Sequence, residues 1–413
     1  MTDKRSDKLS RISALRPVSG LRPSGSACES PDRRADRLTE LLNAECRSNR
    51  LGRHLVLRRW FAQPQPGEIS PRALRRILAN AADSVLQPQQ WLFLDTETTG
   101  LAGGTGTYAF LVGLAWWEDG GLAVEQYFMR DYDEEPSLLL ELSGRLAERR
   151  VLVTFNGKSF DWPLLQTRYR ITRAASLEEP DAHLDLLHPA RQLWRMRLKS
   201  VALSELERQI LGLERGYDIP SETIPRRYFD FLRGGPAEPI IEVFQHNQMD
   251  LRGLASLAVH IIGILHEPES MQCHAEDLFG ISRLLQRRGE EHLAGQIYRR
   301  ALERGLPESA ERTAQRELAL LAKRQRDFEC SNALWEQLLG DSPDGLRAYE
   351  QLAIHYEHQA REPERAATLT REALMRLREA LQAGRVSSYK YQQWHASFQH
   401  RLSRLLLKIQ NSL

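Results

Sequence analysis

The stretch FLDTETTGLAGG, residues 93 to 104, places two acidic residues at the end of a short apolar run. Successive side chains of a β-strand alternate between its faces, so we expect Asp95 and Glu97 to point one way and Thr96 the other. The two carboxylates repel each other unless a positive group lies between them. The preceding WLFL favours a central strand and predicts a site where burial begins. A solvated pair at a sheet edge is the alternative.

Short β-rich runs surround this strand. WLFLDTE is followed by three more, with Gly-containing or charged turns between them and a helical stretch before the last. This order predicts an α/β fold with a mixed sheet flanked by helices. From Asp185 onward the pattern is almost wholly helical, so an all-α region should follow. The later runs are TYAFLVGLAWW (107–117), LAVEQYFM (122–129) and RVLVTFNG (150–157), and the helical stretch is SLLLELSGRLAERR (137–150).

The segment before the sheet divides into an arm and an extension. Residues 1–34 are basic and rich in Ser, Pro and Gly, which predicts disorder. Residues 35–47 have leucines at helical spacing, and residues 54–61 resemble a strand. Residues 1–60 hold 14 Lys and Arg against seven Asp and Glu, so the rest of the chain carries a net charge of −5. The arm is therefore either a solvated tail or a salt-sensitive phosphate contact.

Composition sets wider limits. A chain of 413 residues with 41% apolar and 27% charged residues is typical of a soluble protein of two or three domains. The longest apolar run, Ala109–Trp117, is far shorter than the roughly 20 residues that a membrane helix needs. We therefore expect no membrane partner. The cysteines Cys28, Cys46, Cys273 and Cys330 have neither metal-site spacing nor disulfide density, and we expect a cytoplasmic location.

The last third of the chain has an internal period. IYRRALERG (297–305), LWEQLLGDS (334–342) and LTREALMRL (369–377) align at steps of 37 and 35 residues. This length is near that of the tetratricopeptide repeat, in which helix pairs bury their apolar faces by stacking on neighbours. An irregular helical bundle is the alternative. No catalytic constellation is visible in this part of the sequence.

FNGKSFDW (155–162) carries a second acidic signal. Asp161 follows the predicted strand and opens a helical run, and such strand-to-helix junctions are where sites collect in open α/β sheets. Taken alone, Asp161 would more simply be a helix N-cap.

The third signal lies on a long helix, VFQHNQMDLRGLASLAVHIIGIL (243–265). Asp250 lies on its apolar stripe one turn before Leu254, and His246 lies one turn earlier at the margin. An unpaired carboxylate buried there would cost several kcal/mol. An arginine or a capped loop could neutralise it, yet no other basic residue shares that face of the helix.

The acidic residues would repel one another, so a positive group should neutralise their charge. They come from two strand ends and a late helix, and no matching basic motif accompanies them. The simplest neutraliser is a pair of divalent ions, which prefer oxygen ligands and can clamp a phosphodiester during hydrolysis. His246 would take a proton from the attacking water, or would be a boundary histidine with a structural hydrogen bond. The four carboxylates are Asp95, Glu97, Asp161 and Asp250.

The three motifs together resemble the DEDD exonucleases of the ribonuclease-H-like superfamily. With DIPSETIPRRYFDFL, HLDLLHPARQLW and HNQMDLRGL, the chain looks most like the bacterial YprB-type ribonuclease-H-like proteins. This resemblance implies a 3′–5′ exonuclease in which two Mg²⁺ or Mn²⁺ ions bind to Asp95, Glu97, Asp161 and Asp250. It also implies substrate contacts at Thr98, Thr99, Gly100 and Asn156.

One spacing departs from that family. Its histidine base usually stands five residues before the last aspartate and its tyrosine base four, whereas His246 stands four before Asp250. Endonuclease activity on the same fold, or a scaffold that binds nucleic acid without cleaving it, are the alternative functions. Asp185 in HLDLLH is a candidate fifth carboxylate behind the metal ligands, with a surface or capping role equally open.

Composition and the resemblance together divide the chain. Residues 1–34 form the arm, 35–87 an N-terminal extension, 88–267 the ribonuclease-H-like domain and 270–413 a tetratricopeptide-like domain that could bind a protein partner. The Gly-rich GGTGT (103–107) lacks the Lys-Ser/Thr of a P-loop, so hydrolysis of nucleoside triphosphates is not expected.

Overall fold

The computed structural model describes residues 31–67, 69–78, 83–100, 106–118, 120–340 and 342–411. Most of the predicted disordered arm, residues 1–30, lies outside the described residues. The last four residues of the predicted arm belong to helix α2, which begins at Pro31 and ends at Leu42. The helix predicted for residues 35–47 is also too long at its other end, since strand β1 begins at Glu45.

The predicted mixed sheet is confirmed, and it contains seven strands among the described residues. Its order is β1-β2-β5-β4-β3-β6-β7, with antiparallel pairing from β1 to β3 and parallel pairing from β3 to β7. The extension predicted for residues 35–87 is thus part of this sheet, because β2 pairs with β5 along most of its length. The strands are β1 (Glu45–Asn49), β2 (Gly52–Ala62), β3 (Trp91–Thr98), β4 (Ala109–Glu118), β5 (Gly121–Phe128), β6 (Val151–Thr154) and β7 (Ala182–Asp185).

The three parallel strands all end at the same edge of the sheet. Strands β3, β6 and β7 point the same way, so their carboxyl ends at Thr98, Thr154 and Asp185 lie on one side. Open α/β sheets bind their ligands outside such carboxyl ends. The DTE stretch and Asp161 both belong to this edge.

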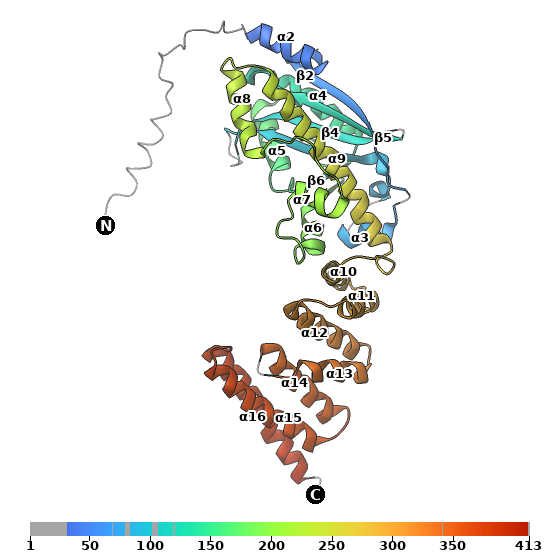
Figure 1. The fold of residues 1–413 in the computed structure, drawn as a ribbon, viewed down its shortest axis with the longest axis vertical. Helices are drawn as coiled ribbons and strands as arrows, with labels where there is room; N and C mark the ends of the chain where they lie inside the picture. Colours follow the sequence, from blue (N-terminus) through green and yellow to red (C-terminus); the bar gives the residue numbers. More distant parts are fainter. Residues whose placement is uncertain are drawn as a thin grey trace, which may run out of the picture.

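Helices cover both faces of the sheet (Figure 1). Trp91 and Phe93 of β3 share an apolar cluster with Leu254 of α9, whereas Leu92 and Leu94, of opposite parity, belong to a second cluster with α4 and α5. This alternation places α9 on the face to which Asp95 and Glu97 also point. The helices around the sheet are α3 (Pro71–Ile77), α4 (Glu135–Glu148), α5 (Asp161–Thr172), α6 (Leu187–Trp194), α7 (Leu203–Leu206), α8 (Ile224–Leu232) and α9 (Glu238–His266).

Helix α9 is long and apolar enough, by length and composition, to cross a membrane. Its apolar residues are nevertheless buried against the sheet and the neighbouring helices, where Leu251, Leu254 and Ile261 belong to the main core. A buried core helix of a globular domain has the same composition as a membrane span.

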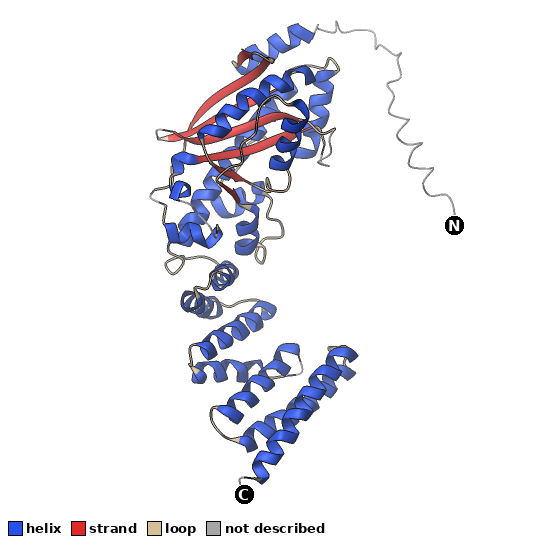
Figure 2. Cartoon of the chain, turned by 180° about the vertical axis from the view of Figure 1, so that it is seen from behind, coloured by secondary structure: helices blue, strands red, loops and turns tan. Residues whose placement is uncertain are grey.

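The chain continues as a helical region, which confirms the predicted second part (Figure 2). Each of the three periodic segments lies wholly or largely on the second helix of a consecutive pair, namely α11, α13 and α15. The apolar cluster of the sheet runs on into α10, α11 and α12, across the predicted boundary near residue 268. These helices are α10 (Ala275–Arg287), α11 (Glu291–Glu303), α12 (Glu308–Arg324), α13 (Phe328–Leu338), α14 (Pro343–His358), α15 (Pro363–Gln382) and α16 (Ser388–Gln410).

Candidate metal centre

Three elements meet near the carboxyl end of β3. Asp95 and Glu97 lie in β3, Asp161 is the first residue of α5 and Asp250 lies on α9. The negative charges of Asp161 and Asp250 raise the pKa values of both Asp95 and Glu97. The structure thus brings the four predicted carboxylates into one region.

His246 belongs to the same cluster. One ligand atom from each of Glu97, His246 and Asp250 can be chosen so that all three lie within 4.8 Å of one another. The histidine side chain is buried, one turn of α9 before Asp250. The four-residue spacing therefore does bring this imidazole next to the carboxylates.

Burial and repulsion between neighbouring acids raise the pKa values of Asp95, Glu97 and Asp161. Burial is the largest cause for Asp95, whose pKa lies well above its usual range, and repulsion from the neighbouring carboxylates adds to it. The pKa of Glu97 is raised well above its usual range by the same two causes. Burial raises the pKa of Asp161 to about 6, against hydrogen bonds from Thr96 that lower it. Such carboxylates retain protons that a divalent cation could replace.

A second carboxylate orients His246. The Nδ1 atom of His246 lies 2.6 Å from Oδ1 of Asp218, and its Nε2 atom lies 3.2 Å from Oγ of Ser221 and 3.4 Å from Oδ2 of Asp250. A carboxylate accepts the proton of Nδ1–H, so the Nε2 lone pair faces the metal-site carboxylates. Although burial alone would raise it, hydrogen bonds from Arg215 and His246 hold the pKa of Asp218 below its usual value. Sequence reasoning missed this residue.

Asp250 has a basic partner, Arg215, which is the arginine alternative that the sequence left open. Its guanidinium donates to Oδ1 of Asp250, to Asp218 at 2.8 Å and to both oxygens of Glu207 at 2.5 and 2.8 Å. The arginine side chain is only 12% exposed. It comes from the loop between α7 and α8, not from the helix face on which a partner was sought. One oxygen of Asp250 is therefore held by an arginine, and Oδ2 faces His246.

Asn247 fixes Asp95 from the other side. Its Nδ2 donates to Oδ2 of Asp95 at 2.7 Å, and its Oδ1 accepts from Nε2 of Gln126 at 2.7 Å. The helix approaches the sheet closely here, because a Cβ on Gly113 would lie 2.1 Å from Oδ1 of Asn247. Gly113 is the β4 partner of Asp95, so only a glycine leaves room for this amide.

Asp161 is held by the neighbouring strand. Thr96 donates a 2.5 Å hydrogen bond from its hydroxyl to Oδ1 of Asp161. The capping alternative is not what the structure shows, since Phe160 occupies the N-cap position and Asp161 the first turn.

Asp185 ties the loop that leads to Asp161. Its carboxylate accepts backbone N–H bonds from Asn156 at 2.8 Å, Lys158 at 3.1 Å and Leu187 at 3.1 Å. The residue is only 4% exposed, so a surface role is wrong; its carboxylate accepts from the first backbone N–H of α6, although Leu186 and not Asp185 occupies the N-cap position. Asn156 adopts a left-handed φ of 68°, a conformation that asparagine tolerates better than most residues.

The predicted substrate residues Thr98, Thr99 and Gly100 follow directly on β3. The Thr98 hydroxyl donates to the carbonyl of Gly100 at 3.0 Å, and Thr99 exchanges two 3.0 Å hydrogen bonds with Tyr108. These contacts shape the start of the β3–β4 connection. Residues 101–105, which include most of the predicted GGTGT turn, lie outside the described residues.

The donor set fits hard divalent cations. Carboxylate oxygens dominate the cluster, and Mg²⁺ and Mn²⁺ prefer oxygen ligands. Glu97, His246 and Asp250 are the donors that lie close enough together to share an ion, and Asp95 and Asp161, which are not in that group, could add their oxygens from beside it.

Comparison with known proteins agrees with this geometry. The family described as RNase_H superfamily matches residues 92–262, which include every residue of the candidate metal centre. The chain is also similar to the uncharacterized protein YprB of Bacillus subtilis (strain 168), with 32% identity over 286 residues. The alignment covers 68% of this chain and 68% of that protein.

Proposed function

The chain belongs to the RNase H superfamily, and from that premise we propose that it is a metal-dependent nuclease, most specifically a 3′–5′ exonuclease. The observation that carries the proposal is the convergence of four carboxylates from β3, α5 and α9 beside an oriented histidine. Crowded, half-buried carboxylates of this kind need a positive partner, and a phosphodiester needs the same positive charge during hydrolysis.

The carboxylates would hold two divalent ions, Mg²⁺ or Mn²⁺. When bound, such ions make water nucleophilic at neutral pH and stabilise the departing oxyanion. Asn247 and Thr96 keep Asp95 and Asp161 in place through their hydrogen bonds. Asp185 keeps the loop before α5 in the conformation that presents Asp161.

His246 would act as the general base. Its Nδ1 proton is held by Asp218, so Nε2 is the atom that accepts a proton from the attacking water. Asp218 would also stabilise the charge that the imidazole gains. The terminal nucleotide would lie against Thr98, Thr99 and Gly100, with Asn156 close by.

The test uses end-labelled single-stranded DNA and RNA, linear and circular, with Mg²⁺ or Mn²⁺. We expect ion-dependent digestion of a linear substrate and its loss in Glu97→Gln. Glu40→Gln, at an exposed position of α2, is the matched control and should digest normally. Cleavage of circles would move the proposal to an endonuclease. Unchanged digestion by Glu97→Gln would overturn the site assignment.

A scaffold that binds nucleic acid without cleaving it is the second candidate. Arg215 favours it, because its guanidinium already compensates Asp250 without a metal ion. Titration with Mn²⁺ separates the candidates: a nuclease binds the ion and digests, whereas a scaffold retains oligonucleotide binding with no ion uptake. A cytoplasmic location, and a protein partner on the helical region, remain parts of the proposal that need their own tests.

A further inference from the structure

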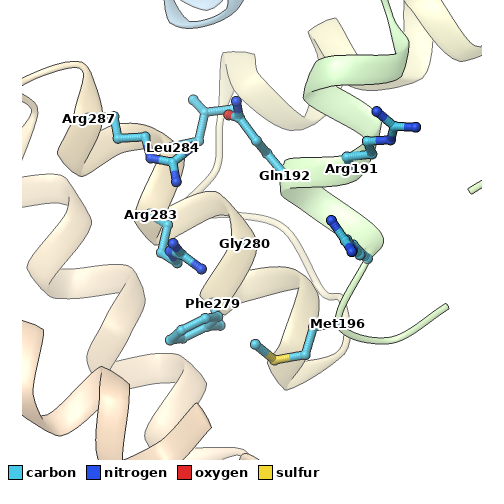
Figure 3. A pocket seen from close by; sticks show the side chains of 9 residues that line it. Arg191, Gln192, Met196, Phe279, Gly280, Arg283, Leu284 and Arg287 are labelled. Atoms are coloured by element: carbon cyan, nitrogen blue, oxygen red, sulfur yellow. The ribbon is translucent and has the colours of Figure 1, made fainter. Parts of the chain in front are cut away.

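A cleft lined by four arginines lies between the sheet domain and the helical region (Figure 3). Its volume is about 430 Å³, and its walls are the end of α6 and the length of α10. Arg283 and Arg287 lie on the α10 side and Arg191 on the α6 side, with Phe279 near one end. Arg195, the residue that caps the end of α6, is the fourth. Within the part of the chain that the structure describes, no acidic residue lines the cleft.

The spacing along each helix places its two arginines together. Arg191 and Arg195 are four residues apart, as are Arg283 and Arg287, so each pair occupies one face of its helix. Gly280 lets the helices approach, because a Cβ there would lie 2.5 Å from the carbonyl oxygen of Leu193. The close packing of α6 on α10 therefore brings two pairs of like charges to one opening.

The structure offers little to neutralise this charge. All four arginines are exposed, and among the described residues none has a carboxylate partner in a hydrogen bond or ion pair. The nearby Asp277 is engaged by Arg197, whose Nε lies 2.8 Å from Oδ1 of the aspartate. The carboxyl end of α6 contributes a partial charge of roughly −0.5, which is small beside four guanidinium groups.

A second basic surface continues from the cleft. Arg287 also lines a pocket with Arg75 and Arg288, on the side of α3. Glu290 in that pocket binds Arg72 and Arg76 and so neutralises part of its charge. The cleft between α6 and α10 is thus the less compensated of the two.

We propose that this arginine cleft binds the phosphate backbone of the nucleic acid whose end occupies the metal centre. The inference rests on the proposed nuclease function and names where the rest of the strand lies. Guanidinium groups bind phosphate oxygens in bidentate fashion, and exposed arginines with no acid beside them are free to do so.

The position of α6 supports a strand over a separate ligand. Arg191 and Arg195 follow Asp185, which ties the loop before Asp161, by six and ten residues. Trp194, beside Arg195, stacks on His260 of α9 with ring centroids 6.1 Å apart, and His260 lies ten residues, or about 15 Å, along that helix from Asp250. This is the length of roughly four or five nucleotides at about 3.4 Å each. A strand leaving the metal centre can therefore reach the cleft.

The experiment compares full-length protein with a variant in which Arg191, Arg195, Arg283 and Arg287 are all Gln. Binding of a fluorescein-labelled single-stranded oligonucleotide is measured by anisotropy in EDTA over a series of KCl concentrations. Because EDTA prevents metal-dependent cleavage, this readout does not depend on activity. The control variant changes Arg299, Arg347, Arg371 and Arg378 to Gln, which are exposed arginines dispersed over α11, α14 and α15.

We expect the cleft variant to bind at least about tenfold more weakly in low salt, with a salt slope smaller by about 0.7 for each phosphate that the variant no longer binds. The control has the same net charge and should bind as the wild-type protein does. Equal weakening of both variants, or of neither, would overturn the proposal. So would a cleft variant that keeps oligonucleotide binding but loses binding of poly-glutamate, since that result indicates an acidic protein partner.

Digestion assays on the same proteins keep this inference apart from the nuclease proposal. If the wild-type protein binds through the cleft yet digests nothing, the cleft stands and the nuclease proposal fails. If it digests normally and the cleft variant binds unchanged, the nuclease proposal stands and the cleft inference fails.

Discussion

The metal centre and the arginine cleft both gather charges of one sign, but they do so at different depths. At the metal centre the carboxylates are half-buried, the pKa values of Asp95 and Glu97 rise, and Arg215 and Asn247 contact Asp250 and Asp95. In the cleft the guanidinium groups remain in water, which screens their repulsion at little cost. Burial therefore decides whether like charges need internal partners.

The largest expected effect comes from changing a carboxylate of the metal centre. Asp95→Asn should lower nuclease activity by about a thousandfold, because one cation ligand is removed where charge develops. The same change should leave the fold intact without metal, or stabilise it, because it removes repulsion while Asn247 keeps an acceptor. Digestion rates and thermal melting in EDTA measure the two effects. A variant that is inactive because it is unfolded would break the comparison.

The pH dependence of stability is a second test of the comparison between the metal centre and the arginine cleft. The folded-state pKa of Asp161 is raised to about 6, so the folded protein binds more protons than the unfolded chain between about pH 4 and 6. Stability without metal should therefore fall as pH rises through this window, by at most about 3 kcal/mol from this group. Melting in EDTA, with Asp161→Asn as the reference, isolates the contribution. A wild-type and variant difference that is constant with pH would contradict it.

Arg215→Gln should destabilise the metal-free protein by about 2 to 3 kcal/mol. The change leaves Asp218, Asp250 and Glu207 without the cation that joins them. Saturating Mg²⁺ should restore part of the stability if the ion compensates the same charges. The check is unfolding by denaturant with and without Mg²⁺, and an identical destabilisation in both would separate Arg215 from the metal centre.

Asp218→Asn should have the smallest effect of the four, a decrease in activity of about ten- to a hundredfold. The imidazole would lose the carboxylate that fixes its tautomer while the metal-site carboxylates stay in place. Stopped digestion assays measure the rate, and metal binding, which should be retained, is the internal control. Unchanged activity would mean that His246 is not the base.

Local pattern was sufficient for much of this fold. The apolar run WLFL before Asp95 and the stripe of α9 predicted the central strand and the buried face, and both are patterns within one element. Strand β1 was missed because ECRSN carries no apolar alternation, since it lies exposed at the sheet edge. Its pairing is determined by β2 and not by its own residues.

The acidic residues of the site were predicted from the sequence, but the residues that form hydrogen bonds with them were not. Arg215 and Asp218 come from an irregular loop whose path no periodicity reveals, so their contacts with Asp250 and His246 could not be derived from spacing. DIPSETIPRRYFDFL was quoted as part of the family resemblance, and nothing in it singled out Asp218. Asn247 adjoins His246 in HNQMD, and an amide beside a buried acid was the one signal that could have found it.

The apolar cluster shared by the sheet and α10 to α12 has a mechanical consequence. Those three helices cannot leave the sheet without exposing Leu278, Phe279 and Ile281 to water, so they should unfold cooperatively with it. Helices α13 to α16 form two further apolar clusters, one of which also includes Ala319 of α12, and they can open as a separate unit. A fragment that stops at residue 267 therefore exposes an apolar surface, whereas one that stops after α12 retains most of the apolar cluster shared by the sheet and α10 to α12.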